Sequence, residues 1–345
     1  MKKIVTSLLI VIFIGLIVIS ITNIDNTKAI PGPITFADEV ISLSQGNSWN
    51  SGASGVYQTN GHEYRYVGAN VNNYVKFNND LYQIIGVFDS NSTGVSANLV
   101  KIIRARSIGG YSWGATNAAS AYTTYSKFDS NWLTANANIL LNEYFLNATD
   151  TSTTYKSCSD WTYYASNNNY KTKDCSKIIG YGIQTEDLRN YIQPVTWYLK
   201  GYKTYNEYSK QDFYTCERSD TITITNCDSG KGTAAKKVEN KSIGLMYLSD
   251  YFYASGYYAS TDEINVRGSN KQNWLYNGAE WTITPRGKGY TDNSYYVYST
   301  NALYEVSYFP YALRPTFYLK SSVYTTGGNG SLRNPYTIAC DDCNS

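Results

Sequence analysis

Histidine is almost absent from this sequence. The 345 residues include a single one, His62, together with six cysteines in three distant stretches. A structural zinc site needs four good ligands, so we expect no bound metal. An α/β-hydrolase needs a histidine later in the chain than its serine nucleophile, whereas His62 precedes the one suggestive pattern, Gly110-Tyr-Ser112-Trp-Gly114. Because other orders of catalytic residues exist, an unrecognised hydrolase that uses Ser112 or a carboxylate pair remains our third hypothesis.

Signatures of nucleotide binding and of other enzymes are also missing. The sequence has neither a G-x-G-x-x-G after a strand nor a lysine-bearing P-loop, and we expect no cofactor. Asp89 to Gly94 imitates the first half of a calcium loop, but Val100 stands where the bidentate glutamate belongs. The adjacent acids Asp262-Glu263 and Asp341-Asp342 lack a spacing suited to glycoside cleavage. These absences favour a protein that is not an enzyme.

Charge is nearly balanced and is never concentrated. The net charge is +2, from 29 basic and 27 acidic residues, and we find no run of five or more like charges. Runs of that kind attract phosphate backbones or anionic lipid. We therefore expect no nucleic-acid partner, and contact with a membrane only through the N-terminal segment.

The N-terminus has the three parts of an export signal. Lys2 and Lys3 precede an apolar run from Ile4 to Ile21, and Thr27-Lys28-Ala29 offers a small-x-small cleavage site. The apolar run is also about as long as a marginal membrane span. Residues 1–29 are therefore predicted to be a signal peptide or an N-terminal membrane anchor, and the rest of the chain is predicted to be extracellular, either secreted or anchored to the cell membrane.

The domain boundaries follow from shifts in composition. Residues 30–56 mix Pro, Gly, Ser and Asn, which is typical of a linker. We expect one domain over residues 57–322. Residues 323–345 are then a C-terminal strand and a polar tail.

Short β-rich runs open the predicted domain. They are separated by Asn, Asp and Gly, which predicts an antiparallel meander, with the strands at 64–67, 73–77, 81–88 and 99–104. The residues at 78–80 predict a tight hairpin, and those at 89–98 a wider one.

Helical periodicity is confined to the middle of the chain. Residues 132–146 carry an apolar stripe at helical spacing, and a second helix over 186–191 should end before Pro194. Strand character returns at 243–248, a structured turn follows at 249–255, and further strands are predicted at 295–299, 316–319 and 334–338. The fold class is α+β, with antiparallel sheets, one or two helices and long irregular loops.

The six cysteines fall into three local pairs. An even number in an exported chain favours disulfides, and although fifteen connectivities are possible for six cysteines, neighbouring pairs are the simplest because each brackets a polar loop. The predicted pairs are Cys158 with Cys175, Cys216 with Cys227, and Cys340 with Cys343. The Cys340-x-x-Cys343 spacing is also that of a redox dithiol, but no helix follows it to lower a thiol pKa, so we favour a terminal staple.

Several motifs together carry a family resemblance. They include Asn73 to Phe88, Lys101-Ile-Ile-Arg104, Tyr111-Ser-Trp113, Gly244-Leu-Met-Tyr247, Ser249-Asp-Tyr251, Trp281-Thr-Ile-Thr-Pro285 and Leu313-Arg-Pro315. Over about Tyr64 to Leu319 the chain resembles domain-of-unknown-function family 6273 of Gram-positive surface proteins. That family is distantly similar to the C-type-lectin-like and sulfatase-modifying-factor folds, which implies a C-type-lectin-like domain.

The resemblance implies the scaffold without the known chemistry of its branches. The sulfatase-modifying enzymes use a reactive cysteine pair near the last strand, and no cysteine lies between Cys227 and Cys340. The calcium-dependent lectins carry Glu-Pro-Asn or Gln-Pro-Asp, and the closest string here, Gln193-Pro-Val195, lacks the final ligand. In such folds Trp113, Trp281 and Arg314 are expected to be structural, with Arg314 holding a buried carboxylate.

Tyrosine, with 36 residues, supplies the candidate ligand contacts. A biased nucleotide composition could explain its abundance, but tyrosine also joins an apolar ring to a hydroxyl group at low entropy cost, as recognition surfaces do. The irregular region of this type of fold would place a set of late residues on one face, although alternation along a strand buries every second residue. The candidate ligand-binding residues are Arg286, Tyr290, Asn293, Tyr295, Tyr296, Tyr304, Tyr308 and Tyr311.

These expectations favour an exported or surface-tethered, non-catalytic binding module. Its partner would be a surface polysaccharide or a protein, recognised through the tyrosine-rich face and giving the chain the role of an adhesin or a carbohydrate-binding protein. The second hypothesis is a structural subunit of a cell-surface assembly, whose tyrosines pack against other subunits.

Overall fold

The structure is a computed structural model, which describes residues 33–46, 53–114, 131–148, 162–165, 169–172, 176–202, 210–218, 227–228, 236–256, 272–287, 293–298, 302–306 and 310–344. The chain divides into Met1–Ile34 and Thr35–Ser345, and the description below concerns the second unit. The predicted export segment, residues 1–29, lies outside the described residues. Within the described part of the chain, no helix is long and apolar enough to cross a membrane.

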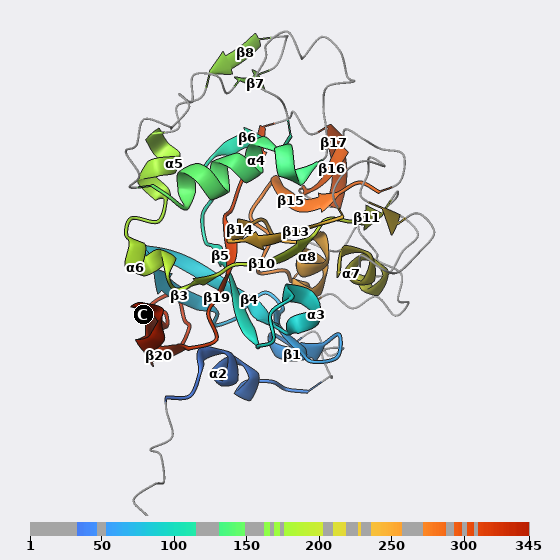
Figure 1. Ribbon diagram of the computed structural model, residues 1–345. Helices are drawn as coiled ribbons and strands as arrows, with labels where there is room; N and C mark the ends of the chain where they lie inside the picture. Colours follow the sequence, from blue (N-terminus) through green and yellow to red (C-terminus); the bar gives the residue numbers. More distant parts are fainter. Residues whose placement is uncertain are drawn as a thin grey trace, which may run out of the picture. The chain divides into compact units, whose positions relative to one another are not determined.

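The largest sheet contains the predicted meander (Figure 1). Its strand order is β1-β2-β4-β5-β19-β14, with β3 also paired to β4 and β9 to β19. The strands are β1 (Gly55–Thr59), β2 (Glu63–Val67), β3 (Tyr74–Phe77), β4 (Asp80–Phe88), β5 (Leu99–Arg104), β9 (Ile192–Gln193), β14 (Ile243–Gly244) and β19 (Thr316–Leu319). The four early strands are confirmed, and so is the strand at 316–319.

The tight turn between β3 and β4 is also confirmed. Asn78 and Asn79 adopt φ values of 54° and 55°, and asparagine tolerates this left-handed region better than most residues. The turn pairs Phe77 with Asp80. This turn fixes the register of β3 and β4, and Asp80 at the start of β4 contacts Arg104 of β5.

A second sheet is built mainly from the late part of the chain. Its order is β17-β16-β15-β18-β6, and only the β15–β18 pair is parallel among these strands. The strands are β6 (Gly110–Ser112), β15 (Glu280–Pro285), β16 (Asn293–Val297), β17 (Ala302–Val306) and β18 (Pro310–Ala312). Four of the five residues of β16 are buried.

Four two-stranded ribbons complete the β structure. They pair β7 (Thr162–Ala165) with β8 (Asn169–Thr172), β10 (Val195–Tyr198) with β13 (Lys237–Lys241), β11 (Gly201–Tyr202) with β12 (Cys227–Asp228), and β20 (Val323–Gly327) with β21 (Thr337–Cys340). The last ribbon was expected to be a strand and a polar tail. Instead, it packs on the body, where backbone hydrogen bonds join Tyr336 to Tyr74 and Lys76 of β3.

The described residues contain more helices than the one or two expected. They are α2 (Phe36–Ser42), α3 (Ser90–Thr93), α4 (Asn136–Ile139), α5 (Ser176–Tyr181), α6 (Glu186–Arg189), α7 (Lys210–Arg218) and α8 (Leu248–Ala254), with 3-10 turns η4 (Trp132–Thr134) and η8 (Asp341–Asn344) and a π-helical segment η5 (Leu140–Phe145). The helix predicted over 132–146 is confirmed as η4, α4 and η5 in succession. The helix at 186–191 is confirmed as α6.

Two of these helices correct the predictions. Residues 35–42 were assigned to a linker, but Thr35 caps α2 by accepting from the backbone of Asp38, and Phe36 packs against Tyr336 at 5.4 Å between ring centroids. Residues 249–255 were assigned to a turn, but they form most of α8, whose first turn is capped by Asp250. In both cases a local side-chain cap offsets a weak helical pattern.

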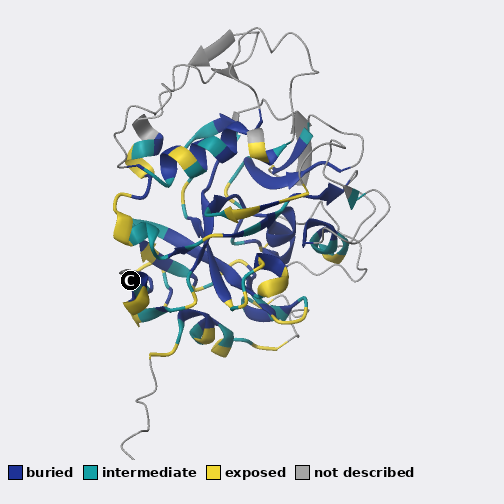
Figure 2. Cartoon of the chain, in the orientation of Figure 1, coloured by how far each residue is buried: buried dark blue, intermediate teal, exposed yellow. Residues whose placement is uncertain are grey.

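Aromatic side chains fill much of the core. Trp113, Trp132, Trp197 and Trp281 are at most 1% exposed, and Figure 2 shows buried residues concentrated in both large sheets. Trp113 donates to the carbonyl of Thr282, and Trp281 donates to that of Tyr111. The structure is thus mixed α+β with mostly antiparallel sheets.

Candidate functional site

The described part of the late tyrosine segment does not form the expected surface. Tyr295 is fully buried, and its hydroxyl donates to the carbonyl of Tyr202 at 2.7 Å. Tyr296 and Arg286 are also buried. Alternation points two adjacent tyrosines to opposite faces of the sheet, and both are covered here, because Tyr295 packs against Phe213 of α7 at 5.6 Å between ring centroids and Tyr296 against Trp281 at 5.8 Å. As surface contacts, these three residues were predicted wrongly.

The other late candidates are placed differently. Asn293 is partly exposed. The half-buried Tyr311 stacks on Tyr296, with 4.1 Å between centroids and 8° between planes, and meets the Trp281 ring at 5.0 Å. Stacking of this kind stabilises a core. Tyr290, Tyr308 and the side chain of Tyr304 lie outside the described residues.

Arg314 holds a buried carboxylate, as expected. Its Nε and Nη2 donate to the two oxygens of Glu280, each at 2.5 Å, and Nη2 also donates to the carbonyl of Leu275. Arg314 precedes β19 of the large sheet, and Glu280 opens β15 of the second sheet. The pair therefore joins the two sheets.

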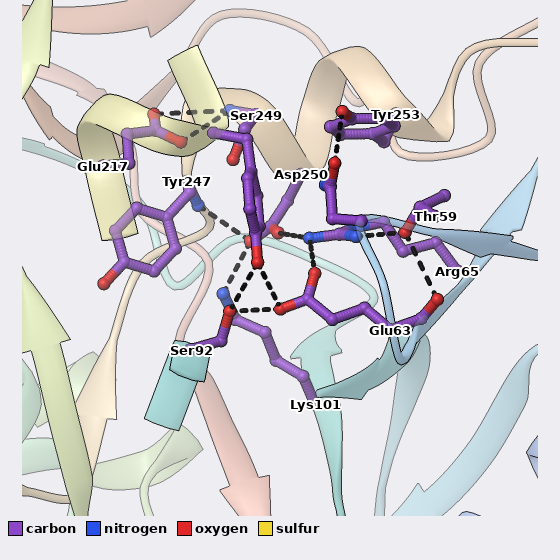
Figure 3. A network of polar contacts seen from close by, with 12 residues as sticks. Thr59, Glu63, Arg65, Ser92, Lys101, Glu217, Tyr247, Ser249, Asp250 and Tyr253 are labelled. Atoms are coloured by element: carbon purple, nitrogen blue, oxygen red, sulfur yellow. Dashed lines mark hydrogen bonds and ion pairs between the residues drawn. The ribbon is translucent and has the colours of Figure 1, made fainter. Parts of the chain in front are cut away.

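A network of buried charged side chains lies between the large sheet and helices α7 and α8 (Figure 3). Asp250 of α8 is at its centre. Lys101 Nζ of β5 is 2.6 Å from Asp250 Oδ2, while Arg218 Nη2 of α7 and Arg65 Nη2 of β2 are 3.3 and 3.9 Å from Oδ1. The same Oδ2 accepts from the backbone N–H of Tyr247. One carboxylate thus connects β2, β5 and α7 to the start of α8.

Glu63 forms a second centre of this network. Its carboxylate is 2.6 Å from Arg65 Nη2 and accepts hydrogen bonds from the hydroxyls of Ser92 and Tyr214. Ser92 lies in α3, and it also accepts from Nε of Arg218 at 3.1 Å. The network therefore includes the wide hairpin between β4 and β5.

Glu217 of α7 lies at the edge of the network and binds the first turn of α8. It accepts from the backbone N–H groups of Leu248 and Ser249 and from the hydroxyl of Thr284. Burial raises the pKa of Glu217 to about 7, although Arg218 and these hydrogen bonds oppose the rise. Its carboxyl group holds the first turn of α8 against α7 and β15.

Lys101 is enclosed by aromatic rings. Its Nζ is between 4.6 and 5.4 Å from the ring centroids of Phe88, Trp197, Tyr247 and Tyr318. Burial lowers the pKa of Lys101 to about 8, against the opposing effect of Asp250. Burial alone would raise the pKa of Asp250, but Lys101, Arg218 and Arg65 together lower it. The cation is held by rings and by one ionic partner.

Shifted pKa values in one cluster are typical of catalytic sites, but this cluster is closed. Its six charged side chains, Glu63, Arg65, Lys101, Glu217, Arg218 and Asp250, are at most 7% exposed. None of them lines the cleft described below. The arrangement is that of a buried ionic network that fixes the positions of its helices.

The described residues also form a surface cleft of about 780 Å³ at the tip of the β3–β4 hairpin. Its lining comes from the Asn78-Asn79 turn, the end of β5 with residues 105–107, Tyr181 of α5, the segment 188–191 and the start of β21. Asn78 fixes one wall, because its side chain donates to the carbonyl of Gly182 and accepts from the backbone of Gln184. Asn78 thus contacts residues that are about a hundred positions later in the chain.

Arg104 organises the cleft. Its Nε donates to Asp80 Oδ2 at 2.7 Å, its Nη2 pairs with the same carboxylate, and its Nη1 donates to the carbonyls of Arg106 and Ser107. Its guanidinium lies 4.4 Å from the ring centroid of Tyr181. Arg104 therefore fixes the loop after β5 and supports one face of an aromatic ring.

Four of the lining residues are exposed, and Asn79 at the turn is one of them. Tyr181 is 41% exposed, and Lys76 and Arg106 are exposed too. Among the residues that the structure describes, neither Lys76 nor Arg106 has an ion-pair partner. No local pattern in the sequence links Tyr181, Lys76 and Arg106, because they come from α5, β3 and the loop after β5, so none of the three was among the predicted contacts.

The two motifs that imitate known sites are structural here. Ser112 is buried within β6, paired with Pro310 of β18, whereas a nucleophile elbow needs a turn between a strand and a helix. Asp89 caps α3 by accepting from the backbone of Asn91 at 3.0 Å. The calcium-like string is therefore a hairpin tip, as predicted.

Two of the three predicted disulfides are present. They are Cys216–Cys227 and Cys340–Cys343. Cys158 and Cys175 lie outside the described residues, so their pairing stays a prediction. Over the residues that are described, no group of three or more His, Cys, Asp or Glu side chains is placed to hold a metal ion.

Comparisons of the chain with known proteins identify no relative. The chain matches no protein-family model, and searches of curated proteins and of solved structures likewise find no match.

Proposed function

We propose that this chain is an exported binding module, secreted or tethered by its N-terminal segment, that recognises a surface polysaccharide or a protein without changing it chemically. The observation that carries the proposal is the cleft of about 780 Å³ at the β3–β4 hairpin. Its volume lies within the range of ligand sites. It replaces the late tyrosine segment as the proposed site of recognition.

The chemistry of the cleft supports recognition. Tyr181 offers an exposed ring that can stack on a sugar or a side chain, and Asn79 is exposed at the turn. The carboxylate of the lining, Asp80, is engaged by Arg104. Groups that stack and donate hydrogen bonds therefore predominate.

The finer fold and family remain part of this proposal. We propose a C-type-lectin-like arrangement related to domain-of-unknown-function family 6273. Trp281 lies in β15, and Arg314 follows β18, the strand that pairs with β15. This position of the late tryptophan and arginine supports the resemblance, as does the α+β class.

The test uses the purified full-length chain on a glycan array and on whole cells. The variant Tyr181→Ala should lose binding, while Tyr298→Ala should retain it, because Tyr298 is similarly exposed, at 47%, and does not line the cleft. Circular dichroism and thermal unfolding confirm that both variants fold. Equal binding by Tyr181→Ala and the wild type would exclude the cleft as the site.

The second hypothesis, a structural subunit of a surface assembly, predicts a different result. The chain would then form defined oligomers in solution and bind neither glycans nor cells. Size-exclusion chromatography with light scattering distinguishes the two hypotheses. The third hypothesis, a hydrolase, would require turnover of a bound polymer, which mass analysis of the ligand after incubation detects.

A further inference from the structure

We infer that the ligand of the cleft is an anionic glycan, a sugar polymer that bears carboxylate or phosphate groups. The inference rests on the binding function proposed above and adds the class of ligand. It is based on the charges at the cleft, on the spacing of these charges, and on the hydrogen bonds that already occupy the neighbouring backbone.

The charge of the lining is positive. The lining contains three cations, Lys76, Arg104 and Arg106, and one carboxylate, Asp80, which Arg104 already neutralises. Lys76 and Arg106 are exposed and make no ion pair within the described ranges of the chain. Two unpaired cations beside a concave surface attract anions, and the attraction falls with salt because both are exposed.

The spacing of the two cations favours a polymer. Lys76 pairs with Leu81 across β3 and β4, and the carbonyl of Leu81 accepts from the backbone of Ala105. Lys76 and Ala105 are therefore two strand spacings apart, about 10 Å, and Arg106 is the next residue. Two cations that project from separate strands can pair with separate charges of one ligand, so a chain with repeated negative charges would use both.

The aromatic part of the cleft favours sugar units. The ring of Tyr181 packs on the Arg104 guanidinium and keeps 41% of the residue exposed. Aromatic faces stack on sugar rings, and the adjacent hydroxyl and amide groups hydrogen-bond. Tyr181 and Asn79 both line the cleft and provide the two kinds of contact.

The backbone around the cleft disfavours an acidic peptide. An extended peptide gains affinity by adding a strand to a free sheet edge. Here the backbone N–H groups of Tyr74 and Lys76 donate to Gly330 and Tyr336, and the carbonyl of Tyr74 accepts from Tyr336. The outer edge of β3 is thus already occupied by the C-terminal segment.

The experiment measures binding of the full-length chain by calorimetry to matched pairs of probes. Oligogalacturonides and their methyl esters differ only in carboxylate charge, and phosphomannan and dephosphorylated mannan differ only in phosphate. Poly-glutamate serves as the acidic peptide. The protein variants are Lys76→Gln/Arg106→Gln and the control Lys236→Gln/Lys237→Gln, which removes the same two charges at exposed positions outside the cleft.

We expect at least one charged glycan to bind about tenfold or more tightly than its uncharged partner. Its dissociation constant should rise between about 50 and about 300 mM salt, because salt screens exposed charges over about 10 Å. The Lys76→Gln/Arg106→Gln variant should lose this preference, and the control should keep it. Comparison of the oligogalacturonides with phosphomannan then shows whether the cleft recognises carboxylate or phosphate groups of the glycan.

Three outcomes would overturn the inference. Equal binding of charged and uncharged probes, both weakened by Tyr181→Ala, leaves the binding function intact and excludes the anionic class. Tighter binding of poly-glutamate identifies an acidic peptide instead. Binding to none of the probes, to no array glycan and to no cells rejects the proposed function itself.

Discussion

Lys101 Nζ and Asp250 Oδ2 are 2.6 Å apart, and both side chains are completely buried. The pair joins β5 to the first turn of α8, and Asp250 caps that helix with the same oxygen. Replacing Lys101 with Met leaves Asp250 with only its two more distant cations. Because a broken buried pair typically costs 3–5 kcal/mol, we expect Lys101→Met to lower the free energy of unfolding by about 3 kcal/mol in urea titrations.

The control for this prediction is the exposed pair Lys237–Glu239, 3.0 Å apart. Exposed pairs typically contribute less than about 1 kcal/mol, so Lys237→Met should change the free energy of unfolding far less. Similar losses in the two variants would show that burial does not strengthen the Lys101 contact.

Glu217 should make the stability depend on pH. Its folded pKa, about 7, is above its ordinary value of 4.5 because burial penalises the charged form. The protonated form is therefore favoured in the folded state, and stability falls as pH rises from 4.5 through about 7. Glu217→Gln mimics the protonated form, and we expect it to be more stable than the wild type at pH 8, by at most about 3 kcal/mol.

Unfolding curves from pH 5 to pH 8 measure this effect. The difference between Glu217→Gln and the wild type should grow across this range, and Glu143→Gln, at an exposed position, is measured beside it as the control substitution. A constant difference would mean that the Glu217 carboxyl does not titrate in the folded protein within this interval.

Arg314 and Glu280 should behave as a unit. Arg314→Met leaves a buried carboxylate without its cation, and we expect a loss of about 3–5 kcal/mol in the free energy of unfolding. The double variant Arg314→Met/Glu280→Gln should regain part of this loss, because no unpaired charge is left. Additive losses in chemical denaturation would argue against a coupled pair.

The two disulfides should differ in their effect on stability. Cys216–Cys227 spans 11 residues in sequence and Cys340–Cys343 spans three. Loop-closure entropy predicts a stabilisation of about 3 kcal/mol for the longer loop and about 2 kcal/mol for the shorter. Thermal unfolding of the two double-alanine variants tests the order, and a larger effect of Cys340 and Cys343 would contradict it.

The third pair, Cys158 with Cys175, is tested without a variant. Peptide mapping of the non-reduced protein should recover a linked peptide that contains both residues. Either cysteine linked to one of the other four would refute neighbouring pairing.

Local patterns in the sequence predicted local structure. The alternating runs that became β2 to β5, the Asn78-Asn79 turn and the apolar stripe around Leu140 were all visible along the chain. Arg314 with a buried carboxylate was also anticipated from the late strand. The strands, the turn and the helix depend on residues that are close in sequence, and the role of Arg314 was inferred from the Leu313-Arg-Pro315 motif.

The sites depended on contacts that no local pattern encodes. Asp250 meets Lys101 across 149 residues, and Tyr181 meets Arg104 only after α5 folds back to the hairpin. Tyr295 looked like a surface residue because its strand is polar and rich in tyrosine. Its burial depends on Phe213 of α7 and on the carbonyl of Tyr202, contacts that the composition of β16 alone does not reveal.

The clamp between the two ends of the body has a mechanical consequence. Thr35 bridges to Tyr324 of β20, and Tyr336, beside β21, is bonded to β3. Any force applied at Thr35 is therefore transmitted to the C-terminal ribbon, and Thr337 and Ile338 of that ribbon line the cleft. If the chain is tethered through its N-terminal segment, as proposed, we expect the cleft wall to respond to load on the tether.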